Sequence, residues 1–78
     1  MELFTASQES EDNGRTFSWY RNSDEEVRTN LTYGELSQLI HHELDRFISE
    51  GFITKEQAYD LSNDWLAYNE FIEGMMYG

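Results

Sequence analysis

Two threonine motifs constrain the fold of this 78-residue chain more than any other feature. Thr32 stands three positions before Glu35, and Thr54 stands three positions before Gln57. In such a capping box the threonine hydroxyl accepts from the third helical N–H, while the Glu or Gln side chain accepts from the N–H of the threonine. Apolar residues flank both boxes at the spacing of a hydrophobic staple. Each motif therefore predicts the start of a helix.

The spacing of apolar residues extends both helices. The first is expected over about 33–50 and ends at Gly51, a residue suited to a left-handed C-cap. The second is expected over about 55–73. Because the link between them is so short, the two helices should be antiparallel neighbours. The predicted core face of the first helix consists of Leu36, Leu39, Ile40, Leu44, Phe47 and Ile48.

The first part of the chain has the features of strands. Asn13-Gly14 is a strong turn signal between a weakly alternating segment and RTFSWYR. Phe17 and Trp19 lie on one face of the second segment, so a β-hairpin is expected over 2–21. A second turn at 22–24 precedes a short third strand at 27–31.

The expected fold class is therefore α+β. A small two- or three-stranded antiparallel sheet is followed by an antiparallel two-helix hairpin. We expect a single domain over 1–78, with the sheet region at 1–31 and the helical hairpin at 32–78.

The charge balance limits the choice of partners. The chain carries 16 acids against 5 bases, a formal net charge of −11. Phosphates would repel such a chain, so neither direct nucleic-acid binding nor binding to an anionic membrane surface is expected. A cationic partner is favoured. Five Phe, five Tyr and two Trp argue against an acidic disordered tail.

The composition also suggests a location. The chain has no Cys, no apolar run of membrane-spanning length and no basic, apolar start typical of a signal peptide. We therefore expect a soluble cytoplasmic protein.

The second predicted helix separates its carboxylates from its core. On a helical wheel the core face contains Leu61, Trp65, Tyr68, Ile72, Met75 and Met76. Glu56, Asp60 and Asp64 form an i, i+4, i+8 stripe on the opposite side, where like charges cost about 0.2–0.5 kcal/mol per pair. This stripe is either an ordinary solvated face or a recognition surface for a basic groove.

Some apolar side chains fall outside this core face. Tyr59, Leu66 and Tyr77 share one sector beside the acids. They fit a protein–protein interface, or are covered by the sheet or the first helix.

Catalytic and metal motifs are lacking. His41 and Asp45 have an i, i+4 spacing that can share a metal, but a closed site needs three or four ligands. No motif surrounds any Ser, and no Gly-rich phosphate loop occurs. We expect neither an enzyme, nor a cofactor, nor a metal.

In size, acidity and aromatic content the chain resembles the small acidic inhibitors of phages and mobile elements, the anti-CRISPR and antirestriction proteins, some of which imitate DNA. The layout of a strand, Asn13-Gly14 and a strand bearing Trp19 is similar to the opening of some antirestriction proteins. The resemblance implies a cytoplasmic protein, in the host cytoplasm if a phage encodes it, that blocks the nucleic-acid site of a host nuclease or surveillance complex.

The leading hypothesis is thus an inhibitor that occupies a basic nucleic-acid-binding groove of a host protein or complex. Alternatives are an accessory interaction protein, such as an antitoxin-like or assembly subunit, a homodimer and, last, a small hydrolase. The expected partner-binding residues are Glu56, Tyr59, Asp60, Asp64, Leu66, Glu70 and Glu73 on the second helix, and Glu11, Asp12, Asp24, Glu25 and Glu26 in turns.

Overall fold

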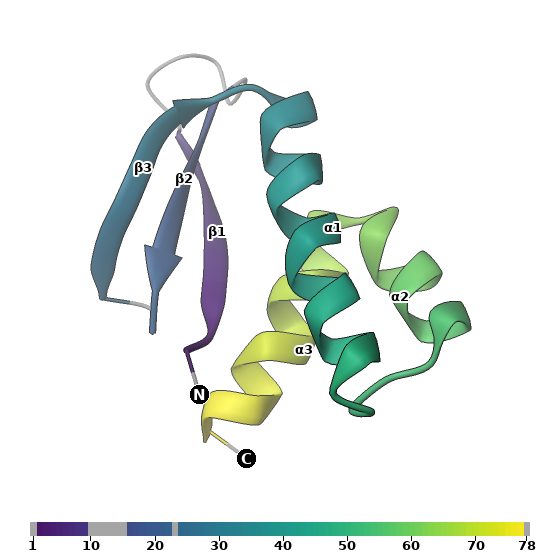
Figure 1. The fold of residues 1–78 in the computed structure, drawn as a ribbon. Helices are drawn as coiled ribbons and strands as arrows, with labels where there is room; N and C mark the ends of the chain where they lie inside the picture. The colour runs from purple at the N-terminus through teal and green to yellow at the C-terminus, as the bar shows by residue number, and fades with distance from the viewer. Residues whose placement is uncertain (1, 10–15, 23, 78) are drawn as a thin grey trace.

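A three-stranded antiparallel sheet is followed by three helices in the computed structural model, which describes residues 2–9, 16–22 and 24–77 (Figure 1). The α+β class and the third strand are confirmed. The predicted turn at Asn13-Gly14 lies outside the described residues. The elements are β1 (Phe4–Glu9), β2 (Thr16–Arg21), β3 (Glu25–Leu31), α1 (Tyr33–Ser49), α2 (Lys55–Ser62) and α3 (Trp65–Tyr77).

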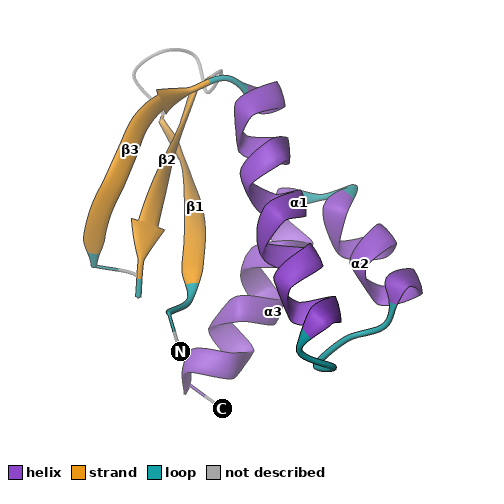
Figure 2. Ribbon diagram, in the orientation of Figure 1, coloured by secondary structure: helices purple, strands orange, loops and turns teal. Residues whose placement is uncertain are grey.

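The sheet and the helices pack as two layers (Figure 2). Strand order is β1-β2-β3, with Ala6 opposite Trp19 and Phe17 opposite Leu31. Phe17 and Trp19 are buried, as their shared face predicts. Trp19 stacks between Phe4 of β1 and Tyr68 of α3, at centroid distances of 5.7 and 6.0 Å.

Side chains of α3 cover the outer edge of β1. The Asn69 amide donates to the carbonyl of Ala6 at 2.6 Å and accepts from its N–H at 2.9 Å. The Tyr68 hydroxyl donates to the carbonyl of Phe4 at 2.9 Å. These bonds satisfy backbone groups that would otherwise form an open sheet edge.

The other edge strand, β3, is irregular. Its pairing with β2 shifts register twice, and one shift skips Val27 between Glu26 and Arg28. Asn30 has a positive φ of 57°. Bulges and charged side chains on an edge strand discourage pairing with another chain. The sheet is therefore protected on both sides, by α3 at β1 and by irregularity at β3.

The first helix begins and ends as predicted. Both hydrogen bonds of the Thr32–Glu35 capping box are present. Gly51 has a φ of 80°, and the N–H of Phe52 donates to the carbonyl of Phe47 at 2.9 Å. The rings of Phe47 and Phe52 meet edge to face, which gives this end the backbone bonds and the apolar contact of a Schellman motif.

The prediction of a single second helix is wrong in one respect. The segment forms two helices, α2 and α3. Its start is confirmed, with the Thr54–Gln57 capping box complete. The chain leaves the helix at Asn63 and Asp64, and the Asp64 carboxylate accepts from the N–H of Leu66 at 2.9 Å. Asp64 thus begins a new helix as its N-cap. The helical part has three helices rather than the expected two-helix hairpin, and α2 and α3 run in different directions (Figure 1).

The core lies where α1 and α3 meet the sheet. The predicted face of α1 is confirmed, with Leu36, Ile40, Leu44 and Phe47 buried and Leu39 and Ile48 partly buried. On α3, Tyr68 and Ile72 are completely buried. Trp65, Met75 and Met76 pack partly buried against the same cluster, as does Leu61 of α2.

Candidate binding surface

The described ion pairs lie at the sheet and on α1. Arg21 contacts Glu25 at 3.1 Å and Glu2 at 3.9 Å, and Arg46 contacts Glu43 at 2.6 Å. Within the part of the chain that the structure describes, no ion pair includes an acid of α2 or α3. The carboxylates of these two helices are therefore not compensated by the described arginines.

The chain contains two further arginines, Arg15 and Arg28. Arg28 lies on exposed β3, where its charge contributes to lowering the pKa of Glu35, behind the larger effect of the capping-box hydrogen bonds to Thr32. Arg15 lies outside the described residues.

Arg46 and Glu43 form a structural cluster that the sequence does not reveal. Glu43 is buried at 7% exposure, and Arg46 also donates to the carbonyl of Glu2 at 2.8 Å and stacks over Phe47 at 5.1 Å. Burial, together with the Glu43 charge, raises the pKa of Tyr68. The i, i+3 spacing of Glu43 and Arg46 was the one feature of the sequence that could have indicated this ion pair. The same spacing is common on solvated helices.

The acids of α2 surround an exposed aromatic ring. Tyr59 is 69% exposed, and Glu56 and Asp60 are exposed beside it. These three side chains and Lys55 line a shallow hollow on the surface of α2. The structure therefore brings three of the predicted site residues together.

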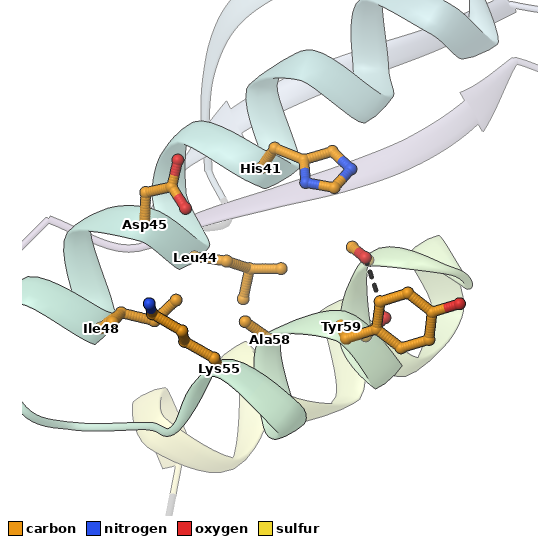
Figure 3. A pocket seen from close by; sticks show the side chains of 8 residues that line it. His41, Leu44, Asp45, Ile48, Lys55, Ala58 and Tyr59 are labelled. Atoms are coloured by element: carbon orange, nitrogen blue, oxygen red, sulfur yellow. Dashed lines mark hydrogen bonds between the residues drawn. The ribbon is translucent and has the colours of Figure 1, made fainter.

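A second hollow lies on the other side of Tyr59, between α1 and α2 (Figure 3). It has a volume of about 270 Å³. Leu44 and Ala58 lie at its centre, between Asp45 and His41 on α1 and Lys55 and Tyr59 on α2 (Figure 3). Ile48 and Ser62 complete the lining. We call this hollow the α1–α2 groove.

Asp64 does not belong to a continuous acidic stripe. Its side chain caps α3, and the break before it ends the i, i+4, i+8 pattern that a single helix would have produced. The wheel that placed Tyr59, Leu66 and Tyr77 in one sector is wrong for the same reason. Tyr59 belongs to α2, and Leu66 and Tyr77 belong to α3, although all three are exposed.

The acids of α3 lie on its outer side. Glu70 and Glu73 are exposed, as is Leu66 at 55% exposure. With an i, i+4, i+7 spacing, these three side chains share one face of α3, away from buried Tyr68 and Ile72. This face of α3 therefore carries two carboxylates and one apolar side chain.

The acids predicted in turns do not extend this surface. Asp24, Glu25 and Glu26 are exposed, but Glu25 pairs with Arg21 and Glu26 accepts from the Tyr20 hydroxyl at 3.3 Å. Figure 1 shows the start of β3 on the opposite side of the molecule from α2. Glu11 and Asp12 lie outside the described residues.

Within 2–9, 16–22 and 24–77, no three His, Asp or Glu side chains gather so that they could hold a metal ion. Over the same ranges, no helix combines the length and apolar character needed to cross a bilayer. Comparison with protein families, curated proteins and solved structures finds no match.

Proposed function

We propose that this protein is a non-enzymatic acidic binding protein that occupies a basic, nucleic-acid-binding groove of another protein, in the manner of an anti-CRISPR or antirestriction inhibitor. The observation that supports it most is the group of exposed carboxylates on α2 and α3. Glu56, Asp60, Glu70 and Glu73 take part in none of the described ion pairs. Exposed acids without bases attract a cationic surface and repel nucleic acid itself.

The proposed binding surface is smaller than the one expected from the sequence. The broken helix and the position of the start of β3 argue against one long acidic face that copies a DNA strand. The acids of α2 beside Tyr59, and the acids of α3 beside Leu66, offer instead two short surfaces of mixed charge and apolar character. Aromatic and aliphatic side chains within such surfaces add contact area and specificity.

A pair of charge-matched variants tests this proposal. The helix variant carries Glu56→Gln, Asp60→Asn and Glu70→Gln, and the control variant carries Asp24→Asn, Glu26→Gln and Glu50→Gln. Both lose three negative charges from exposed positions. Wild-type protein on a resin would capture its partner from a bacterial extract treated with nuclease, and the affinity of the purified partner would then be measured for all three forms.

We expect the helix variant to bind about tenfold more weakly and the control variant to bind nearly as tightly as the wild type. This estimate takes about 0.5 kcal/mol for each exposed charge contact. Equal affinity of the helix variant and the wild type at low salt would refute the proposal. Equal weakening in both variants would indicate only a general effect of net charge.

Exposed Tyr59 and Leu66 also support a second candidate, an interaction subunit that dimerises through these side chains. Sedimentation of the pure protein separates the two candidates. A concentration-independent monomer favours the inhibitor, and a dimer that Leu66→Ala or Tyr59→Ala dissociates favours the second candidate.

A further inference from the structure

We propose that the α1–α2 groove receives an arginine side chain of the basic partner, with the guanidinium stacked on the ring of Tyr59. This inference rests on the proposed function, because it requires a cationic partner. It specifies an arginine as the side chain that the partner must present and Tyr59 as the residue that binds it.

The shape of the groove fits a long side chain. Leu44 and Ala58 form an apolar floor where α1 and α2 meet, and Ile48 extends it (Figure 3). The ring of Tyr59 stands at one end of this floor, with most of its surface in solvent. The three methylene groups of an arginine can lie along such a floor while the charged head remains near water.

The charges around the ring favour a cation. Asp45 lines the groove from α1, and Glu56 and Asp60 line the hollow on the other side of Tyr59. Lys55 contributes the one positive charge among the residues that line these two hollows. Three carboxylates against one ammonium give the two hollows together a formal net charge of −2. A carboxylate ligand would be repelled there.

Arginine fits this environment better than lysine. Its guanidinium is planar and weakly hydrated, so it can stack on an aromatic face while its N–H groups donate to carboxylates. The protein already uses this contact twice, with Arg21 over Phe4 at 5.7 Å and Arg46 over Phe47 at 5.1 Å. In both cases the same arginine also pairs with a glutamate. At Tyr59 the ring and the carboxylates are present, and the partner would supply the cation.

The test is a titration of the whole chain, labelled with ¹⁵N, by the capped peptide Gly-Arg-Gly-Arg-Gly. Matched peptides carry lysine or uncharged citrulline in place of arginine. We expect saturable shifts of the Leu44, Asp45, Ala58 and Tyr59 amides with the arginine peptide, weaker binding of the lysine peptide and no binding of the citrulline peptide. Shifts spread evenly over exposed carboxylates, shifts confined to α3, or no shifts at all would overturn the proposal.

Substitutions of Tyr59 distinguish a contact with the aromatic ring from simple burial of apolar surface. Tyr59→Phe should bind the arginine peptide like the wild type, and Tyr59→Leu should bind about two- to fivefold more weakly, the factor expected for an exposed cation–π contact. Tyr33→Leu is the control, because it makes the same change at another exposed tyrosine, one that lines neither hollow. Unchanged peptide binding by Tyr59→Leu would also overturn the proposal.

Measurements with the captured partner distinguish failure of this inference from failure of the proposed function. If Tyr59→Leu binds the partner like the wild type while the three-charge helix variant does not, the arginine site is wrong and the acidic binding surface stands. If both bind like the wild type, the proposed function fails as well.

Discussion

Asn69 joins α3 to the free edge of β1, and its removal should destabilise the whole domain. The side chain makes two hydrogen bonds to the backbone of Ala6, at 2.6 and 2.9 Å, and Ala6 is only 6% exposed. In Asn69→Ala both backbone groups lose their partner. Each hydrogen bond contributes about 1 kcal/mol net, and more if water cannot replace it.

The expected magnitude follows from these contributions. Two lost bonds cost at least about 2 kcal/mol, and the higher helix propensity of alanine returns about 0.5 kcal/mol. The net loss should therefore be about 1.5 kcal/mol or more, out of the roughly 4–12 kcal/mol typical of a domain this size. The midpoint of thermal unfolding should fall by about 6–12 °C.

Urea unfolding followed by tryptophan fluorescence measures this loss, with circular dichroism as a second probe of two-state behaviour. Glu70→Ala is the matched control, because it changes the adjacent exposed residue of the same helix and should alter stability by less than about 0.5 kcal/mol. If Asn69→Ala is as stable as Glu70→Ala, then Asn69 does not hold the β1 edge, and the packing of α3 on the sheet needs another cause.

Three other substitutions test the local structure. Asp64→Ala should lower the free energy of unfolding by about 1 kcal/mol in urea. Asp64→Asn keeps the cap and should be nearly as stable as the wild type. An equal loss of stability in both variants would contradict the capping role. Gly51→Ala should cost about 1 kcal/mol because of its φ of 80°, with a smaller loss for Gly51→Asn, and no loss in either would argue against a left-handed residue there. Burial raises the pKa of Tyr68 above its ordinary value of 10.0, so folded Tyr68 keeps its proton where the unfolded chain releases it. Its contribution to stability is complete below about pH 10 and decreases as the pH rises further. Tyr68→Phe should therefore show a shallower alkaline loss of stability than the wild type, and identical slopes would contradict this assignment.

Local signals in the sequence predicted most of the fold. The capping boxes at Thr32 and Thr54 and the glycine at position 51 determine where helices begin and end through nearby backbone bonds, so a short stretch of sequence suffices to recognise them. The alternation around Phe17 and Trp19 predicted a strand because side chains on one face of a strand recur at every second residue.

The break between α2 and α3 was missed although it has a local signal. Leu61, Trp65, Tyr68 and Ile72 keep a helical spacing across it, and this periodicity outweighed Ser62, Asn63 and Asp64, three residues that favour caps and turns. The error changed the candidate site, because a wheel drawn through the break placed Asp64 and Leu66 in stripes with residues of α2.

Contacts between distant residues could not be predicted. Asn69 and Ala6 are 63 positions apart, and neither residue type identifies the other as its partner. The α1–α2 groove likewise depends on how two helices pack, although each lining residue is visible in the sequence. Sequence reasoning named Tyr59 and the acids beside it, and the structure added Leu44 and Asp45 from the facing helix.

Competition between this protein and nucleic acid for the purified partner tests the central claim most directly. The partner's binding to labelled nucleic acid would be titrated at several fixed concentrations of the 78-residue protein. If the acidic helices occupy the nucleic-acid groove, the apparent Kd for nucleic acid should rise in proportion to the protein concentration, with an unchanged plateau, and the helix variant should shift it about tenfold less. A stable complex of partner, nucleic acid and this protein together, with an unchanged Kd, would contradict the account.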